Sequence, residues 1–420
     1  MVQETDLIKI FNQTLKPSQI TEVNPIFIDN DDPNHNWTKF ATEHYWCTGS
    51  GTSEDPYLIE FISITGQLHD SSIEIRNSNE YFVLRHCFLT ESIDMYQKNA
   101  VIKLYNVNNS EITDIMSYSH NSNGILLINS HHNYFYSNNF DVHSLSGMCL
   151  IDSTNNIIHL NSFCHNNISG IELINSQYNT FNHNFIWENK IFGINLTISD
   201  SNELYFNEVE SNPIGVSFFR SNNTQFNNNI VDWNNFGIFV NDSYGNKIEK
   251  NNVEDNIIGI TILESYNNSI IGNTVKDNDI GLFLLSTNTT KIFDNMLIRN
   301  DQIGIILDFS SCNNRIYRNC FIGNYFQGTD YGILNIWDDG NIGNYWDDYD
   351  GEDEDGDGIG DIAYLINGTA NSQDNFPLMR CILIPIPPEY SVITIILTLV
   401  FIAGALGIIV FFFYRRRRST

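Results

Sequence analysis

Residues Gly193–Ile214 read GINLTISDSNELYFNEVESNPI, and the next stretch, Gly215–Phe236, reads GVSFFRSNNTQFNNNIVDWNNF. Both begin with a glycine that is followed by apolar residues one and three positions later. This glycine recurs every 22 or 23 residues, at Gly124, Gly147, Gly170, Gly193, Gly215, Gly237, Gly259, Gly281 and Gly304. A fixed period of this length is typical of a solenoid built from stacked repeats.

The other positions of the repeat also lie at fixed distances from the glycine. In most repeats serine follows after six residues, asparagine after nine, fourteen and nineteen, and apolar residues after eleven and sixteen. Counted from Gly304, the serine is Ser310 and the first asparagine is Asn313. Each repeat therefore contains three short runs in which apolar and polar residues alternate, which is the period of a β-strand.

These runs are too short for helices, and asparagine favours turns. We predict an all-β parallel β-helix with three strands per coil and about eleven coils, from about Ser72 to Tyr325. Inward apolar side chains are expected to form columns, and inward asparagines to form amide ladders. A leucine-rich repeat has a similar period, but its L-x-x-L-x-L run is absent.

The organisation expected from these patterns is one elongated repeat domain with terminal pieces. The predicted segments are an N-terminal cap (1–46), the β-helix repeats (47–330), a C-terminal cap with an acidic loop (331–380), a Pro-rich spacer (381–391), a transmembrane helix (392–414) and a basic tail (415–420).

The transmembrane prediction rests on Val392–Tyr414, which has 23 residues without a charge. As a helix it would measure about 34 Å, enough to span a bilayer. Arg415–Arg418 follow at once, so the positive-inside rule predicts a cytoplasmic tail and a β-helix outside. Residues 1–20 contain no apolar run of the kind found in a signal peptide. The protein is therefore predicted to lie in a membrane, which it crosses once.

Charge and cysteine content limit the partners. The chain has 50 acidic and 21 basic residues and a net charge of −29. Nucleic acid is excluded as an expected partner because phosphate binding needs a basic face. An acidic surface suits divalent cations or neutral glycans. The seven cysteines form no C-x-x-C pair and are expected mainly as small core or turn residues; one disulfide stays open as an alternative.

One acidic stretch has the spacing of a cation loop. Residues 353–361 read DEDGDGIGD, so carboxylates alternate around a glycine that permits a sharp turn. We predict a structural calcium ion bound by four residues, Asp353, Asp355, Asp357 and Asp361. Position 12 of the loop is Tyr364 rather than a bidentate Glu, so the loop is not a complete EF-hand. The alternative is a solvated acidic loop without an ion.

Two flanking motifs add a family resemblance. Gly49–Glu60 (GSGTSEDPYLIE), Gly343–Tyr349 (GNYWDDY), the acidic loop and Asp374–Leu378 (DNFPL) resemble the entry and closing segments of archaeal NosD-like β-helix proteins. With the repeats, the resemblance covers about residues 46–380. It implies a right-handed parallel β-helix, often at the cell surface. It further implies carbohydrate binding or sugar hydrolysis, or, as in the family's namesake, periplasmic copper insertion for nitrous oxide reductase.

The function expected first is a non-enzymatic module that binds glycans or other components of the cell envelope. Outward aromatic residues can stack on sugar rings. The candidates are Tyr136, Tyr178, Trp187, Tyr205, Trp233 and Tyr244.

A polysaccharide hydrolase or lyase is the first alternative, and it needs paired acids or a calcium cluster with a base. The acids of the coils look scattered along the sequence, and the pairs Asp338–Asp339 and Asp347–Asp348 fall in the closing segment. No catalytic residue is therefore assigned from the sequence.

Copper binding is the second alternative. His120 and His143 occupy the same position in neighbouring repeats, and stacked imidazoles can bind a soft metal. His165 lies one residue out of that register, and no Met/His/Cys cluster is present. We therefore favour the interpretation that these histidines replace asparagine at turns, and copper is not expected as a cofactor.

Overall fold

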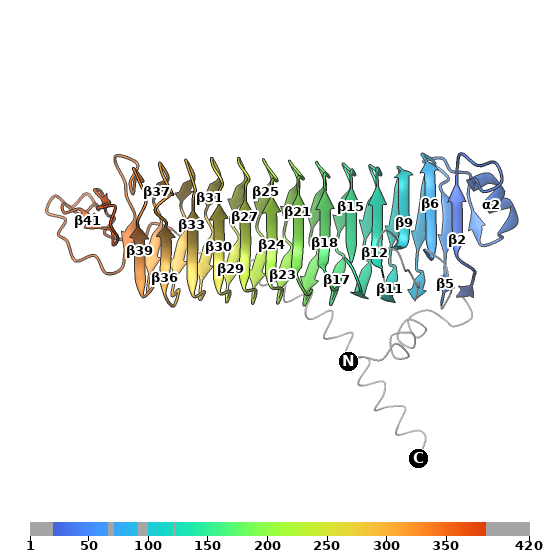
Figure 1. Cartoon of the computed structure of the whole chain (residues 1–420), viewed down its shortest axis with the longest axis horizontal. Coiled ribbons are helices and arrows are strands. Elements are labelled where there is room, and N and C mark those ends of the chain that lie inside the picture. Colours follow the sequence, from blue (N-terminus) through green and yellow to red (C-terminus); the bar gives the residue numbers. More distant parts are fainter. Residues whose placement is uncertain (1–19, 66–70, 91–99, 121, 384–420) are drawn as a thin grey trace, which may run out of the picture. The chain divides into compact units, whose positions relative to one another are not determined.

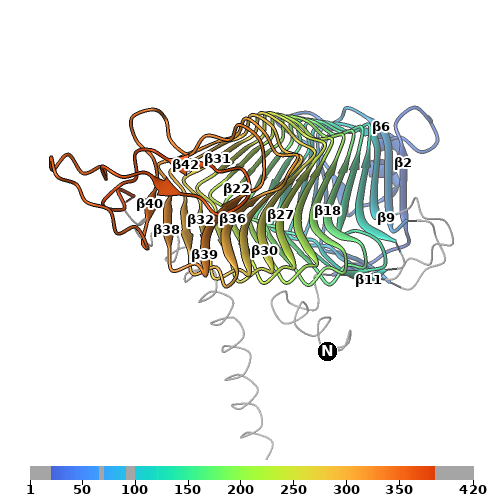
Figure 2. The same ribbon diagram turned by 60° about the vertical axis from the view of Figure 1, so that its left-hand side comes forward.

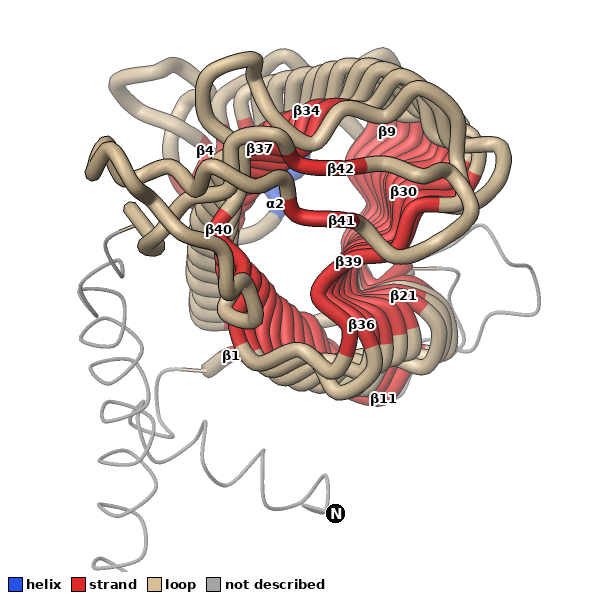
Figure 3. The backbone as a smooth tube through the Cα atoms, turned by 90° about the vertical axis from the view of Figure 1, so that its left-hand side faces the viewer, coloured by secondary structure: helices blue, strands red, loops and turns tan. Residues whose placement is uncertain are grey.

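The computed structural model describes residues 20–65, 71–90, 100–120 and 122–383. Residues 20–383 contain three long sheets that wind around one core, and the strands of each sheet stack along the solenoid axis (Figure 1, Figure 2). All neighbouring strands within them are parallel except β3 and β4. Viewed along the axis, the three sheets surround the core as three separate walls (Figure 3). This is the predicted right-handed parallel β-helix.

Sheet A has 14 strands, which are β1 (Thr21–Glu22), β5 (Ile62–Ile64), β8 (Phe88–Thr90), β11 (Met116–His120), β14 (Asn139–His143), β17 (Ser162–Cys164), β20 (Phe185–Trp187), β23 (Glu208–Glu210), β26 (Ile230–Asp232), β29 (Asn252–Glu254), β32 (Thr274–Lys276), β35 (Met296–Ile298), β38 (Cys320–Ile322) and β40 (Tyr345–Trp346).

Sheet B has 13 strands, which are β2 (Ile26–Asp29), β6 (Ile73–Ser78), β9 (Ala100–Val107), β12 (Asn123–Ile128), β15 (Met148–Ile151), β18 (Ser169–Ile174), β21 (Phe192–Thr197), β24 (Ile214–Phe219), β27 (Phe236–Asn241), β30 (Ile258–Leu263), β33 (Ile280–Leu285), β36 (Ile303–Leu307) and β39 (Phe326–Asp330).

Sheet C has 13 strands, which are β3 (Cys47–Thr48), β4 (Tyr57–Glu60), β7 (Phe82–Arg85), β10 (Ser110–Thr113), β13 (Tyr134–Tyr136), β16 (Ile157–His159), β19 (Thr180–Asn182), β22 (Glu203–Tyr205), β25 (Gln225–Asn227), β28 (Lys247–Glu249), β31 (Ser269–Ile271), β34 (Lys291–Phe293) and β37 (Arg315–Tyr317).

The chain passes through sheets B, C and A in turn and completes about twelve coils, one more than predicted. The additional coil is the first, formed by β2, β4 and β5. Its strands do not follow the repeat spacing, because residues 30–56 separate β2 from β4. That insertion contains helix α2 (Trp37–Glu43) and β3, so the 22-residue period is interrupted.

One predicted register is wrong near the C-terminal end. Ser311 and Asn314, rather than Ser310 and Asn313, occupy the serine and asparagine columns, where they accept hydrogen bonds from Thr287 N and Thr290 N. Both bonds join residues 24 apart, so this coil is longer than its neighbours. Counting forward from Gly304 assumes a constant coil length and therefore misses the added residue.

The recurring glycine is required by close packing between coils. A Cβ atom on Gly215 would lie 2.6 Å from the carbonyl oxygen of Gly237 and 3.0 Å from the side chain of Asn234. The same collision with the glycine of the next coil recurs from Gly124 to Gly281. Apolar residues beside these glycines, such as Ile194, Val216 and Ile238, are fully buried and form the core.

Asparagines at the three turns form the predicted amide ladders. In each ladder an asparagine donates its backbone N–H, and usually its side-chain N–H, to the Oδ1 atom of the asparagine one coil further on. The second side-chain N–H bonds to a backbone carbonyl, as from Asn184 to Ile158 over 2.9 Å. Buried amides are thereby hydrogen-bonded, which the desolvation of a polar group requires.

Within the described residues, no helix is both long and apolar enough to cross a membrane. The transmembrane segment predicted at 392–414, the basic tail and most of the spacer lie outside those residues.

The C-terminal end of the stack is closed by residues after β39. The antiparallel pair β41 (Tyr364–Leu365) and β42 (Gln373–Asp374) lies across the end of the coils (Figure 3). Inside, the rings of Phe321, Trp346 and Tyr364 stack with successive centroid distances of 4.3 Å. A disulfide joins Cys320 to Cys381, 61 residues further on. The disulfide left open by the sequence is therefore present, while five other cysteines are free.

Candidate functional site

Carboxylate and aromatic side chains are concentrated on the outer surface of sheet A. Parallel register places Trp187, Glu210, Asp232 and Glu254 in one column across four strands, from β20 to β29. Strand neighbours lie about 4.8 Å apart, so Glu210 and Asp232 are adjacent carboxylates. We call the surface formed by Trp187, Glu208, Glu210, Asp232, Trp233 and Glu254 the acidic face.

Proximity and burial change the acidity of these groups. Burial, with Glu210 and then Glu208 as the strongest repelling neighbours, raises the pKa of Asp232 to about 7. Burial and Glu210 raise the pKa of Glu208 to about 6. The pKa of Glu210 is also raised, mainly by burial and then by Glu188. Because burial first, and neighbouring negative charges second, disfavour the ionised form, the raised pKa of Asp232 keeps a fraction of this carboxyl protonated near neutral pH.

Aromatic rings flank this carboxylate column. Trp233 follows β26 directly and is 64% exposed. Trp187 lies beside Phe185, with ring centroids 6.1 Å apart, and is contacted edge-on by His165 at 4.7 Å. His165 is held between two carboxylates, with Asp141 2.8 Å from Nδ1 and Glu188 3.1 Å from Nε2. The arrangement therefore offers flat apolar rings next to hydrogen-bond acceptors.

The acidic face is the part of the surface that sequence reasoning missed. In the sequence, Asp232 looks like one of several scattered acids, because the residues next to it in the chain do not show which residues lie beside it in the sheet. A spacing of 22 residues links Glu210, Asp232 and Glu254, and this is the period of these coils. Applying the repeat period to charged positions, as well as to apolar ones, would have placed them together.

The predicted calcium ligands occupy an exposed loop of the C-terminal cap. Carboxylate oxygens of Asp353, Asp355 and Asp357 lie within 4.8 Å of one another. Asp353 shapes the turn by accepting backbone N–H groups of Gly356 over 2.8 Å and Gly358 over 3.0 Å. Asp361 instead accepts the N–H of Glu354 over 2.7 Å. Oxygen donors of this kind suit a hard cation such as Ca²⁺.

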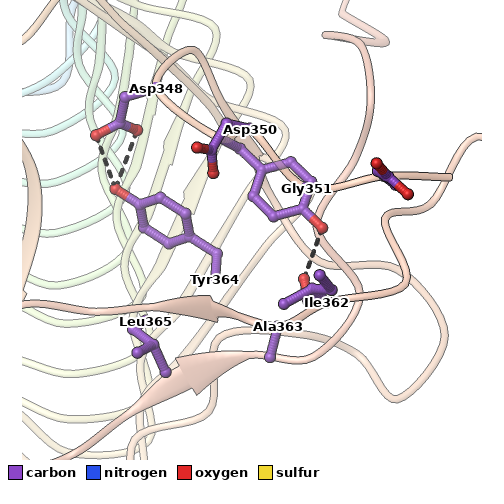
Figure 4. Close-up of a pocket in the computed structure, with 9 residues that line it drawn as sticks. Asp348, Asp350, Gly351, Ile362, Ala363, Tyr364 and Leu365 are labelled. Atoms are coloured by element: carbon purple, nitrogen blue, oxygen red, sulfur yellow. Dashed lines mark hydrogen bonds between the residues drawn. The ribbon is translucent and has the colours of Figure 1, made fainter.

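Next to this loop the cap contains a cavity of about 330 Å³ (Figure 4). Its wall combines the carboxylates of Asp348 and Asp350 with the ring of Tyr364 and the apolar Ile362 and Leu365. Tyr364 donates its hydroxyl to both oxygens of Asp348, at 3.0 and 3.1 Å. Burial and Asp348 raise the pKa of Tyr364, so the phenol stays protonated. These hydrogen bonds link β41 to the segment that follows β40.

His120 and His143 are register partners on β11 and β14. The side chain of His143 is buried, and its backbone N–H donates to Oδ1 of Asn166 over 3.0 Å. His143 therefore stands at the start of an asparagine ladder, as expected of a histidine that replaces asparagine at a turn. Among the side chains that the structure describes, the one group of three or more His, Cys, Asp or Glu able to share an ion is the Asp353 trio. That oxygen-only set does not fit copper.

The six aromatic candidates fall on different surfaces. Trp187 and Trp233 belong to the acidic face, at the end of β20 and directly after β26. Tyr136 and Tyr205 belong to strands of sheet C. Tyr244 stacks on Tyr266 at 5.1 Å at a turn, and Tyr178 is 61% exposed.

A second run of rings follows sheet C along the axis. Tyr136 lies 5.6 Å from His159, His159 lies 5.4 Å from His183, and His183 stacks on Phe206 at 5.1 Å. Tyr136, His159, Asn182 and Tyr205 form one column in register. This band contains no carboxylate, in contrast to the acidic face.

Comparison with known proteins supports the fold and a family. The family model described as periplasmic copper-binding protein (NosD) matches residues 60–232 and 216–351, together more than half of the chain. Two relatives described as probable ABC transporter binding protein NosD match a shorter stretch. The one from Pseudomonas aeruginosa is 46% identical over 66 residues, and the one from Stutzerimonas stutzeri is 45% identical over 67 residues. Each match covers 16% of this chain and only 15% of the relative.

Among solved structures, the A-module of the Azotobacter vinelandii mannuronan C-5 epimerase AlgE6 is similar, with a TM-score of 0.52. The match covers 67% of this chain and 87% of the module at 15% identity. At this identity the likeness concerns the fold alone.

Proposed function

The chain belongs to the NosD family, and from this premise we propose that its β-helix binds an extended glycan across the acidic face of sheet A. The observation that carries the proposal is the Glu210–Asp232–Glu254 column with Trp187 and Trp233 beside it. Indole rings stack on the apolar faces of sugars, and carboxylates accept hydrogen bonds from hydroxyl or amino groups. The strand spacing presents such acceptors at regular intervals along the axis.

The negative charge of the protein determines which class of glycan the acidic face is expected to bind. The chain has a net charge of −29, and the acidic face adds several carboxylates in one place. A polymer of uronic acids would be repelled, whereas a neutral or amino-sugar polymer would not. The proposed ligand is therefore a glycan without carboxylates.

The test is retention of the full-length chain on immobilised neutral, amino-sugar and uronic-acid polysaccharides. Retention on the first two classes is expected, and the Trp187→Ala/Trp233→Asn variant should bind about twofold to tenfold more weakly per lost ring. Phe309→Ala is the matched control, because Phe309 is 66% exposed and lies far along the chain from the acidic face. Unchanged retention in the double variant, or preference for the uronic-acid polymer, would refute the proposal.

One observation favours a second function, cleavage of the bound glycan. The raised pKa of Asp232 keeps a proton available for a leaving oxygen, while Glu210 beside it can act as nucleophile or base. The strand spacing of about 4.8 Å is close to the roughly 5–5.5 Å that separates the carboxyl groups of retaining glycosidases. New reducing ends in the retained polysaccharide, reduced about 100-fold or more in Asp232→Asn, would establish cleavage. Their absence would leave binding alone.

The remaining proposals concern location and the cap. Residues 392–414 are proposed to anchor the protein, with the β-helix outside the cytoplasm and Arg415–Arg418 inside. The Cys320–Cys381 disulfide supports an oxidising compartment, where disulfides persist. A calcium ion at Asp353, Asp355 and Asp357, with Asp361 nearby, is proposed to stabilise the cap.

A further inference from the structure

The outer surface of sheet B carries no charge over six consecutive strands. The strands β21, β24, β27, β30, β33 and β36 contain no Asp, Glu, Lys or Arg, although the chain has a net charge of −29. We call the outward side chains of these six strands the apolar face. It lies on a different wall of the β-helix from the acidic face (Figure 3).

The apolar face consists of three columns in parallel register. The first column contains only phenylalanine and isoleucine, at Phe192, Ile214, Phe236, Ile258, Ile280 and Ile303. The third column adds Phe219, Leu263 and Leu285. Beside these columns, Ile191 and Ile257 stand just before β21 and β30 and are 43% and 52% exposed. A continuous apolar surface of this size marks a site of interaction.

The middle column alternates small and large side chains. In chain order its members are Asn195, Ser217, Phe239, Thr261, Phe283 and Ile306. The midpoint of the six strands lies between β27 and β30. At equal distances from this midpoint, Phe239 corresponds to Thr261, and Phe283 corresponds to Ser217. The column therefore has the pattern of a surface that is complementary to itself after a half-turn.

We propose that the apolar face binds a second copy of this chain, about a two-fold axis that runs parallel to the strands and passes between β27 and β30. Phe239 of one copy then lies opposite Thr261 of the other, and Phe283 lies opposite Ser217. Both copies contribute the same surface, as a closed two-fold dimer requires. The strands of the two facing sheets are aligned, an arrangement in which side chains interdigitate over about 10 Å.

Area and charge both fit this occupant. Six strands about 4.8 Å apart and about 20 Å long present about 600 Å² per copy. Two copies bury about 1,200 Å² in total, which is the lower limit for a specific, stable interface. Two molecules with a net charge of −29 repel each other, so they approach at least cost through a face without charge. Arg220, Asp242 and Glu264 follow β24, β27 and β30 and supply the polar rim that such interfaces have.

The first test measures the mass of the full-length chain in non-ionic detergent by sedimentation velocity over a range of protein concentrations. A monomer–dimer equilibrium with a micromolar dissociation constant is expected. Added salt should strengthen it, because screening weakens the repulsion between two acidic molecules. Phe239→Asp should weaken dimerisation at least about tenfold, because it places an unpaired carboxylate in the interface. Phe293→Asp is the matched control, since Phe293 is a half-buried phenylalanine on the outer side of sheet C.

Cross-linking tests the symmetry without a charged substitution. Ser217→Cys/Phe283→Cys places two thiols three strand spacings apart in one copy, about 14 Å, but opposite each other across the interface. A short bis-maleimide should therefore convert this double variant to a covalent dimer. Ser217→Cys alone and Phe283→Cys alone should remain largely uncross-linked. The wild type, with its five free cysteines, measures the background.

Three results would overturn the proposal: a native chain that stays monomeric at about 100 µM, a Phe239→Asp variant that dimerises as tightly as the wild type, or single cysteine variants that cross-link as well as the double variant. Hydroxyl-radical oxidation of Phe239 in the native chain identifies a different occupant. Rising protein concentration should protect this ring. Protection by added phosphatidylcholine vesicles instead would assign the apolar face to a lipid surface and would also overturn the dimer. None of these readouts depends on glycan binding.

Discussion

The carboxylate of Asp374 accepts the backbone N–H of Asn344 over 2.7 Å, and this contact ends an asparagine ladder that runs along the solenoid. Asn344 is the last asparagine of the ladder that includes Asn295 and Asn319. Its side-chain N–H would point at the next coil, but no further coil follows. Asp374 supplies the missing acceptor, and its Oδ2 atom also accepts the indole N–H of Trp346 over 2.9 Å.

The other two ladders end in the same way. Asn335 donates to Oδ1 of Asp330 over 3.0 Å. Asn324 donates to Gln327 over 2.7 Å, and Gln327 donates to Asp347. All ladder amides have one orientation, so their unsatisfied N–H donors gather at the C-terminal end. Carboxylates are the strongest acceptors for such donors, which explains the acidic character of the cap interior.

The first prediction concerns this ladder end. Asp374→Ala leaves several buried donors without an acceptor, each costing about 1–3 kcal/mol. Asp374→Asn keeps one oxygen and should cost less. Hydrogen exchange measured by mass spectrometry should show β40 to β42 opening first in the alanine variant. Equal stability of the two variants would contradict the role assigned to Asp374.

The second prediction concerns the pH dependence of stability. The folded-state pKa of Asp232 is about 7, well above the value of about 3.9 for an unfolded Asp. The native state therefore binds more protons between about pH 4 and pH 7, and its stability falls as pH rises through this range. Asp232→Asn should remove this contribution, so the variant should be more stable than the wild type at pH 8. Denaturant melts at pH 5 and pH 8 measure the difference. Asp242→Asn, at an exposed aspartate paired with Arg220, is the control.

The third prediction concerns calcium. Saturating Ca²⁺ at about 100 times its dissociation constant should stabilise the cap by about 2.7 kcal/mol, and a chelator should reverse this. Asp353→Ala should abolish the response, because Asp353 also shapes the loop through Gly356 and Gly358. Asp350→Asn, outside the trio, should preserve it. The site is excluded if calorimetry detects no calcium binding to the wild type and calcium leaves its melting temperature unchanged.

The fourth prediction concerns the disulfide. Closing a 61-residue loop between Cys320 and Cys381 is worth about 4 kcal/mol in the chain-entropy model. Cys320→Ser/Cys381→Ser should lower the unfolding free energy by an amount of this order, and Cys312→Ser, at a free cysteine, should have little effect. Peptide mapping without reduction tests the pairing directly; two free thiols at these positions in the purified protein would disprove it.

The fifth prediction concerns the glycine column. Gly215→Ala places a Cβ atom 2.6 Å from the oxygen of Gly237, so the coils must separate locally. Overpacking of this kind costs about 1–3 kcal/mol. Gly328→Ala is the matched control, since the nearest atom to its Cβ is 3.3 Å away, in the ring of Trp337. Denaturant unfolding should show a larger loss of unfolding free energy for Gly215→Ala than for Gly328→Ala. An equally small loss in both variants would argue against this packing.

The sequence predicted the interior of the coils well because each repeat makes the same contacts as its neighbours. Ile238 and Asn234, for example, meet residues one coil away that the repeat itself specifies. The prediction failed where the period changes, at the first coil and at Ser311 and Asn314. An insertion or an added residue shifts every later position, and a pattern counted from one glycine does not contain that information.

The repeat alone therefore determined the β-helix, its apolar columns and its asparagine ladders, because these depend on contacts between equivalent positions. Tertiary structure decided the rest. Cys320 pairs with Cys381, and Asn344 meets Asp374, although each partner occupies a position that the other does not share in the repeat. No periodic rule relates such residues. Their proximity results from how the turns and the closing segment fold against the completed stack, and the candidate sites depend on the same geometry.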